Sequence, residues 1–259
     1  TRIIAPACHD TGSAVAAVKA SGTTAFLSSG TWSLLGTEVP QPITTDAALR
    51  LNFTNEGGVN GTVRLLKNIT GMWLLEGCLR DWSAQGQTLD YPQIVDAARQ
   101  ASPFRCFIDP DHASFLHPQS ITGAITAYCH STAQPAPTST GEFARVIMES
   151  LALKYRVVLE QLESITGTRF DEIRVIGGGS GNELLNEFTA NATGRRVIAG
   201  PKEATALGNL IVQFAGAGAI ASIDEGRDLI SRSFEPRVFL PQSGWNRQYS
   251  AFQNLLCRL

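Results

Sequence analysis

The stretch RVIGGGSGN, residues 174–182, indicates the fold class of the 259-residue chain. A run of β-forming residues ends there in three glycines, and Ser180 and Glu183 form a Ser-x-x-Glu pattern that can cap a following helix. Glycines let a ligand approach the backbone closely, and the first turn of the next helix presents free N–H groups suited to phosphate. A simple tight turn between strand and helix explains the same pattern. The Rossmann form GxGxxG fails because its sixth position is Asn182, and the sequence contains no GxxxxGK[ST] loop.

The segments on both sides of this turn alternate between helix and strand. Before it, Ser139-x-x-Glu142 has the pattern of a capping box and predicts a long helix that ends near Gly167. After it, residues 195–201 predict a short strand and residues 203–218 predict a helix. This order of elements predicts an α/β domain whose ligand site is formed by loops at the strand ends.

The first half of the chain predicts a different mixture of elements. Apolar runs predict strands, Asn-Gly is the usual two-residue hairpin turn, and apolar residues at helical spacing predict amphipathic helices. A region rich in Pro, Ser, Thr, His and Asp predicts loops. We therefore expect strands over 2–8 and 24–36, a short helix over 13–19, a hairpin over 50–67 around Asn60-Gly61, a helix over 65–82 and loops over 102–140.

The overall composition argues against several classes of function. The net charge is −2 and no block of Lys and Arg stands out, so we expect no nucleic-acid partner. No apolar run approaches the ~18–20 residues that span a bilayer, so we expect no membrane partner. The five cysteines are odd in number and form no CxxC pair, which argues against a disulfide framework or a zinc site. We expect a cytoplasmic protein, and the start at Thr1 predicts that the chain is a piece of a longer one.

Two further stretches place polar residues where an α/β sheet binds ligands. In SSGTWSLLG, residues 28–36, a turn at Gly30 and Thr31 could meet phosphate oxygens, although a plain hairpin gives the same pattern. His9-Asp10-Thr11 follows the first predicted strand, at the end where side chains face the ligand crevice. Asp10 could act there as a general base, and a helix-capping role fits the local sequence equally well.

Two glycine turns and an aspartate at strand ends, without a P-loop, indicate the actin-like ATPase architecture. The chain resembles, in order across residues 3–215, the C-terminal half of the FGGY family of carbohydrate kinases. Within that family, SSGTWSL and LKNITGMWLL are similar to the rhamnulokinase branch. The stretches that carry the resemblance are ACHDTGSAV, LSSGTWSLLG, TNEGG, LKNITGMWLLEGC and IGGGSGNELLNEFTANATGRRVIAGPKEATALGN. The resemblance implies that residues 1–259 form an actin-like (RNase H-like) α/β domain, the nucleotide-binding lobe of a sugar kinase whose N-terminal lobe is absent.

The resemblance also implies roles for particular residues. Asp10 matches the base that takes the proton from the attacking sugar hydroxyl, and the metal ligands are left unassigned. Two positions depart from the family pattern, because Cys8 stands where glycine is usual and Glu76 stands where Gln is common. The implied sugar contacts are His9, Asp10, Thr11 and Asn68, and the implied nucleotide contacts are Gly30, Thr31, Glu76, Gly178, Gly179 and Asn182.

The implied reaction is the ATP-dependent phosphorylation of a ketose, L-rhamnulose to L-rhamnulose 1-phosphate. The implied cofactors are ATP or ADP and Mg²⁺, and the implied partners are the N-terminal kinase lobe and the sugar. We expect this chain alone to be inactive, because half of the cleft is missing. Two alternatives stay open at this point: a kinase for another sugar such as L-fuculose or xylulose, and a non-catalytic module that binds nucleotide or sugar.

Overall fold

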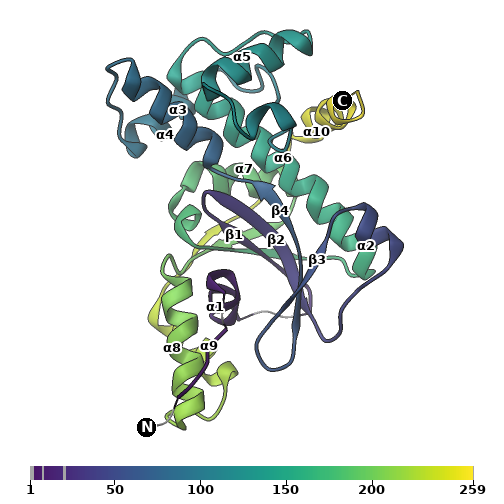
Figure 1. Cartoon of the computed structure of the whole chain (residues 1–259), viewed down its shortest axis with the longest axis vertical. Helices are drawn as coiled ribbons and strands as arrows, with labels where there is room; N and C mark the ends of the chain where they lie inside the picture. The colour runs from purple at the N-terminus through teal and green to yellow at the C-terminus, as the bar shows by residue number, and fades with distance from the viewer. Residues whose placement is uncertain (1–2, 8, 20–21, 259) are drawn as a thin grey trace.

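A seven-stranded mixed sheet forms the centre of the computed structural model, which describes residues 3–7, 9–19 and 22–258 (Figure 1). The strands lie in the order β3-β4-β2-β1-β5-β6-β7. β1, β5 and β6 run parallel to one another, and the other neighbouring pairs are antiparallel. The strands are β1 (Thr24–Ser29), β2 (Trp32–Val39), β3 (Thr54–Gly57), β4 (Val63–Thr70), β5 (Glu172–Ile176), β6 (Arg196–Ala199) and β7 (Arg237–Phe239).

Ten α-helices surround this sheet in the described part of the chain, and none of them is both long and apolar enough to cross a membrane. The helices are α1 (Asp10–Ala16), α2 (Asp46–Arg50), α3 (Trp73–Ala84), α4 (Tyr91–Gln100), α5 (Ile121–Ser131), α6 (Thr140–Thr166), α7 (Glu183–Thr193), α8 (Ala204–Ala217), α9 (Ile223–Ser233) and α10 (Asn246–Leu256).

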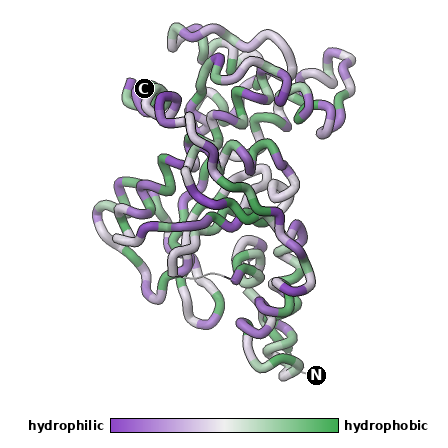
Figure 2. The backbone as a smooth tube through the Cα atoms, turned by 180° about the vertical axis from the view of Figure 1, so that it is seen from behind, coloured by the Kyte–Doolittle hydropathy of each residue, from purple (hydrophilic) through white to green (hydrophobic). Residues whose placement is uncertain are grey.

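Helices cover both faces of the sheet, which confirms the predicted α/β class. α6 and α7 pack on one face, whereas α1, α8 and α9 cover the other (Figure 1). Side chains alternate across a strand, so in β1 Leu27 joins the core on the α6 side and Phe26 joins the core on the α1 side. Hydrophobic stretches accordingly run both through the central strands and through the helices that pack on them (Figure 2).

The predicted long helix and the predicted hairpin are confirmed. α6 begins after Ser139, whose Oγ accepts a hydrogen bond from the N–H of Glu142, and ends at Gly167 with a φ of 66°. Glycine adopts this left-handed conformation without a Cβ clash, which explains the helix end. Between β3 and β4, Asn60 and Gly61 have φ values of 55° and 74°, as an Asn-Gly hairpin turn requires.

Two predictions for the first seventy residues are wrong. Residues 3–7 form no strand, because Pro6 cannot donate to a ladder; residues 2 and 8 lie outside the described residues. The predicted helix over 65–82 is a strand up to Thr70 and a helix only from Trp73. Leu65 and Ile69 are four residues apart, a spacing that puts them on one side of a helix and equally on one side of a strand. Both are fully buried within β4.

Two further predictions are corrected in the second half. The region 102–140 is not all loop, since it contains α5, which begins after Ser120. The Ser120 Oγ accepts a hydrogen bond from the N–H of Gly123, so the hydroxyl residues that predicted a loop include the cap of a helix. The cap of α7 is Asn182 rather than Ser180, whose Oγ donates instead to the carbonyl of Gly177.

Candidate functional site

A cleft of about 580 Å³ opens where α1, the β1–β2 turn and the end of β5 meet. It joins segments that are far apart in sequence, and its lining includes several polar residues and glycines that the sequence predicted for the site. Seven of the ten predicted site residues line this cleft: His9, Asp10, Thr11, Gly30, Thr31, Asn68 and Gly178.

The β1–β2 turn is held against the beginning of α3. The carbonyl groups of Gly30 and Thr31 accept hydrogen bonds of 3.0 Å from the N–H groups of Met72 and Trp73, respectively. These are among the donors that a helix start leaves without an internal partner. The turn is therefore fixed by backbone bonds, which leaves the Thr31 side chain on its exposed side. The Thr31 Oγ1 donates to the Glu76 Oε1 at 3.1 Å, so Glu76 contacts the turn without lining the cleft.

The glycine loop after β5 lies directly against β1. Gly177 has a φ of 81°, a left-handed conformation that favours glycine. A Cβ atom built on Gly179 would lie 2.0 Å from the Ser29 Oγ, so this position has room only for glycine. A Cβ atom on Gly178 would meet nothing within 4 Å, because Gly178 faces the open cleft. The two turns named by the sequence thus lie side by side at one end of the sheet.

Asn182 lies behind the glycine loop and does not line the cleft. Its Oδ1 accepts a hydrogen bond from the N–H of Leu185, and its Nδ2 donates to the Tyr91 hydroxyl at 2.7 Å. Burial raises the pKa of Tyr91 to about 12, so this phenol stays protonated at neutral pH. Gly179 and Asn182 therefore shape the loop from behind, whereas Gly178 presents its backbone to the cleft.

Asp10 is the first residue of α1 and points into open solvent in the cleft. Its side chain is 77% exposed, and its Oδ1 lies 3.1 Å from the His9 Nδ1. The same oxygen accepts the N–H of Thr11 at 2.6 Å. One carboxylate oxygen is thus occupied by neighbours, and the other is accessible to a ligand hydroxyl.

Close packing against α8 fixes the position of α1. A Cβ atom on Gly208 of α8 would lie 1.7 Å from the carbonyl oxygen of Ser13, so the two helices approach through this glycine. The Ser13 Oγ also donates to the carbonyl of Ala7 at 3.1 Å and secures the chain before the helix. The base candidate is therefore attached to a rigid element.

The cleft also contains residues to which the sequence gave no role. Glu56, from β3, lines it together with Trp32 and Thr205. Glu56 belongs to the TNEGG stretch, but a carboxylate on a short edge strand carries no local signal of a site. Only the fold brings it next to His9 and Asn68.

The family model for the C-terminal domain of the FGGY family of carbohydrate kinases matches residues 25–217. A rhamnulokinase of Bacteroides thetaiotaomicron is 50% identical over 255 residues, which are 97% of this chain and 52% of that protein. A rhamnulokinase of Bacillus subtilis is 40% identical over 93% of this chain and 49% of that protein. The chain thus spans about half the length of the curated relatives it matches.

Solved structures of the same family share the fold. The xylulose kinase of Rhodospirillum rubrum superposes with a TM-score of 0.69 at 17% identity, over 96% of this chain and 49% of that one. Plasmodium falciparum glycerol kinase with ADP superposes with a TM-score of 0.63 at 16% identity, over 96% of this chain and 49% of that one. The actin-like fold class is thereby confirmed. From the family match and the two relatives together, the chain belongs to the FGGY family of carbohydrate kinases and corresponds to its C-terminal domain.

Proposed function

We propose that this chain is the nucleotide-binding lobe of an ATP-dependent ketose kinase that converts L-rhamnulose to L-rhamnulose 1-phosphate. The observation that carries the proposal is the cleft that joins Asp10 to both glycine turns. The substrate follows from the two rhamnulokinases that are 50% and 40% identical to the chain. The remaining part of the proposed enzyme is an N-terminal lobe, which would close the cleft from the other side.

Each part of the cleft has a role in this reaction. The backbone at Gly178 and the turn at Gly30 and Thr31 would bind the nucleotide phosphates, because they present N–H groups and a hydroxyl without bulky side chains. Asp10 would take the proton from the sugar hydroxyl as that hydroxyl attacks the terminal phosphorus. Phosphoryl transfer requires mainly positioning and charge stabilisation, so a rigid base beside two phosphate turns suits it.

His9, Thr11 and Asn68 would orient the sugar. His9 and Thr11 both contact the Asp10 Oδ1 and line the cleft on either side of it. Asn68 lies on β4 and lines the same cleft, and its side-chain amide offers both a donor and an acceptor to ligand hydroxyl groups. Glu76 would act on the nucleotide side through its hydrogen bond with Thr31.

The residues of the cleft also fit the magnesium ion that such a reaction requires. Mg²⁺ is usually held by substrate phosphates, water and one or two carboxylates rather than by a protein cage. The described residues contain no group of three or more His, Cys, Asp or Glu that could hold a metal. The Asp10 carboxylate lines the cleft with the phosphate turns, and the Glu76 carboxylate contacts Thr31 of one turn. When bound, the ion would neutralise charge on the transferred phosphoryl group.

The complete gene product that contains this chain tests the proposal. Purified protein would be assayed for ADP release with L-rhamnulose, L-fuculose and D-xylulose in separate reactions, each with and without Mg²⁺. We expect the highest kcat/KM for L-rhamnulose and a product phosphorylated at O1. Preference for another ketose would mean that the protein is a sugar kinase but that L-rhamnulose is the wrong substrate. ADP binding without turnover on any sugar would overturn the proposal in favour of a non-catalytic module.

A further inference from the structure

The carboxylate of Glu56 lies in the cleft in a position that the proposed reaction does not yet use. Glu56 comes from β3, the edge strand next to β4, and its side chain is 31% exposed. It lines the cleft with His9, Asp10 and Asn68, and it also lines a neighbouring hollow of about 590 Å³ that includes His9 and Gly57. Glu56 thus stands at the border between these two hollows.

A buried arginine fixes the Glu56 side chain. Arg64 faces Glu56 across the β3–β4 pair, and its Nη2 lies 3.0 Å from the Glu56 Oε2. The Arg64 Nε donates to the carbonyl of Gly57 at 3.1 Å, while the Arg64 side chain is only 3% exposed. A guanidinium held in this way restricts the rotamers of its carboxylate partner, and the Glu56 Oε1 stays available to a ligand.

Arg64 also lies beneath the first turn of α1. A Cβ atom on Gly12 would lie 3.3 Å from the Arg64 Nη2, and Gly12 is two residues from Asp10. Although the Arg64 Nη1 is buried, it has no hydrogen-bond partner among the described residues, so the guanidinium retains unused donor capacity beneath α1. One buried cation therefore supports both Glu56 and the turn that carries Asp10.

Charge explains why Glu56 needs this partner. The cleft has to accept the negative phosphates of a nucleotide, and a second unpaired carboxylate near Asp10 would repel them. Pairing with Arg64 offsets the charge of Glu56 but leaves an oxygen that accepts hydrogen bonds. Such an oxygen suits a sugar hydroxyl better than it suits a phosphate, because a hydroxyl donates to it and a phosphate does not.

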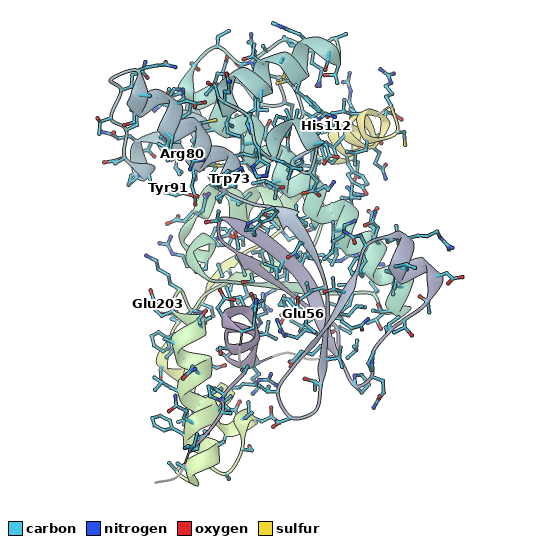
Figure 3. The ribbon with its side chains drawn as sticks, viewed as in Figure 1. Glu56, Trp73, Arg80, Tyr91, His112 and Glu203 are labelled. Atoms are coloured by element: carbon cyan, nitrogen blue, oxygen red, sulfur yellow. The ribbon has the colours of Figure 1, made fainter. Side chains whose placement is uncertain are left out.

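The position of Glu56 in the sheet indicates which end of the sugar it would meet. Gly178 follows β5, and Gly30 and Thr31 connect β1 to β2, so the phosphate turns lie toward β1 and β5. Asn68 lies on β4 and Glu56 lies one strand further, on β3. Across the sheet, Glu56 (labelled in Figure 3) therefore lies farther than Asn68 from the β1–β2 turn and from β5.

We propose that Glu56, positioned by Arg64, determines sugar specificity by accepting a hydrogen bond from a ketose hydroxyl other than the one that Asp10 would deprotonate. The proposal rests on the proposed kinase function and adds a specificity residue to it. A hydrogen bond to a charged group contributes enough binding energy for a change of about 10–100-fold when it is removed. Loss of the carboxylate should therefore weaken sugar binding and leave nucleotide binding nearly unchanged.

Glu56→Gln and Glu56→Asp in the complete gene product test this inference, with Glu38→Gln as the matched control. Arg64 of β4 has Glu56 of β3 as its neighbour on one side and Glu38 of β2 as its neighbour on the other. Glu38 pairs with Arg227 at 2.9 Å and does not line the cleft. Steady-state kinetics with L-rhamnulose and ATP, calorimetric binding of L-rhamnulose and melting temperatures would be measured for each variant. Glu56→Asp keeps the charge but shortens the side chain, so it remains informative if Glu56→Gln fails to fold.

We expect both Glu56 variants to raise the KM and Kd for L-rhamnulose by about 10–100-fold, with the KM for ATP within about twofold of wild type. Glu38→Gln should leave both KM values unchanged. A wild-type sugar Kd in the Glu56 variants would overturn the inference, and so would an equal rise in both KM values or a fall in melting temperature alone. If the unaltered protein turns over no ketose, the proposed function fails instead, and the calorimetric comparison still decides whether Glu56 binds the sugar.

Discussion

At the scale of single residues, the proposed base Asp10 gives the most direct test of whether the cleft is catalytic. Asp10→Asn keeps the shape of the side chain but removes its ability to accept a proton. Because general acid–base catalysis contributes about 10²–10⁴-fold in rate, we expect kcat of the complete gene product to fall by that factor, with little change in the KM for ATP. The measurement is steady-state kinetics on L-rhamnulose, together with the melting temperature of each variant.

Asp46→Asn is the matched control for this substitution. Asp46 is the first residue of α2, as Asp10 is of α1, and it lies outside the cleft. Losing an acidic group at a helix start costs about 0.3–1 kcal/mol through the helix dipole, and Asp46→Asn should show that cost without a change in kcat. If Asp10→Asn is also only destabilised and remains active, the base is another residue.

At the scale of elements, the sequence predicted the parts of the fold whose signals are local. The ends of α6 and the turn between β3 and β4 follow from a capping serine, a terminal glycine and an Asn-Gly pair. The sequence-based prediction was wrong for residues 65–70, because the spacing of Leu65 and Ile69 fits both a helix and a strand. It also missed α5, because the hydroxyl residues at the start of that helix are typical of loops as well. Seven predicted site residues meet in one cleft, whereas Glu56 depends on strand pairing that no local pattern reveals.

Substitutions at the two neighbouring glycines of the loop after β5, Gly178 and Gly179, test ligand access and internal packing separately. Gly179→Ala would place a methyl group against Ser29, so we expect it to lower the free energy of unfolding by about 1–3 kcal/mol. Gly178→Ala meets no protein atom, so its melting temperature should stay near that of the wild type while its methyl group obstructs the nucleotide. Thermal melting and ADP calorimetry on both variants check this. Equal ADP affinity in Gly178→Ala and wild type would contradict a phosphate contact at this loop.

At the scale of the whole molecule, ion pairs between a buried lysine and two half-buried aspartates join the helical end of the domain to the sheet. Lys154 on α6 lies 2.7 Å from Asp109 and 3.0 Å from Asp111, and Asp111 in turn accepts the N–H of Thr70 at the end of β4. Burial lowers the pKa of Lys154, but the two aspartates outweigh it and raise the pKa overall. Lys154 is therefore charged throughout the physiological range and belongs to the scaffold. Because these contacts and two apolar cores all lie within the described residues, we expect the chain to fold without a partner lobe.

The proposed site requires a second lobe, so we expect the 259-residue chain to fold without being active. The Asp10 and His9 side chains are 77% and 60% exposed, so the described residues leave the proposed base open to water. We expect the isolated chain to unfold cooperatively in urea and to show no measurable turnover of ATP with L-rhamnulose. The same chain carrying Asp10→Asn, purified in parallel, measures any contaminating kinase. Mg²⁺-dependent turnover by the wild-type chain that Asp10→Asn abolishes would show that one lobe suffices, and that the second lobe contributes binding rather than catalysis.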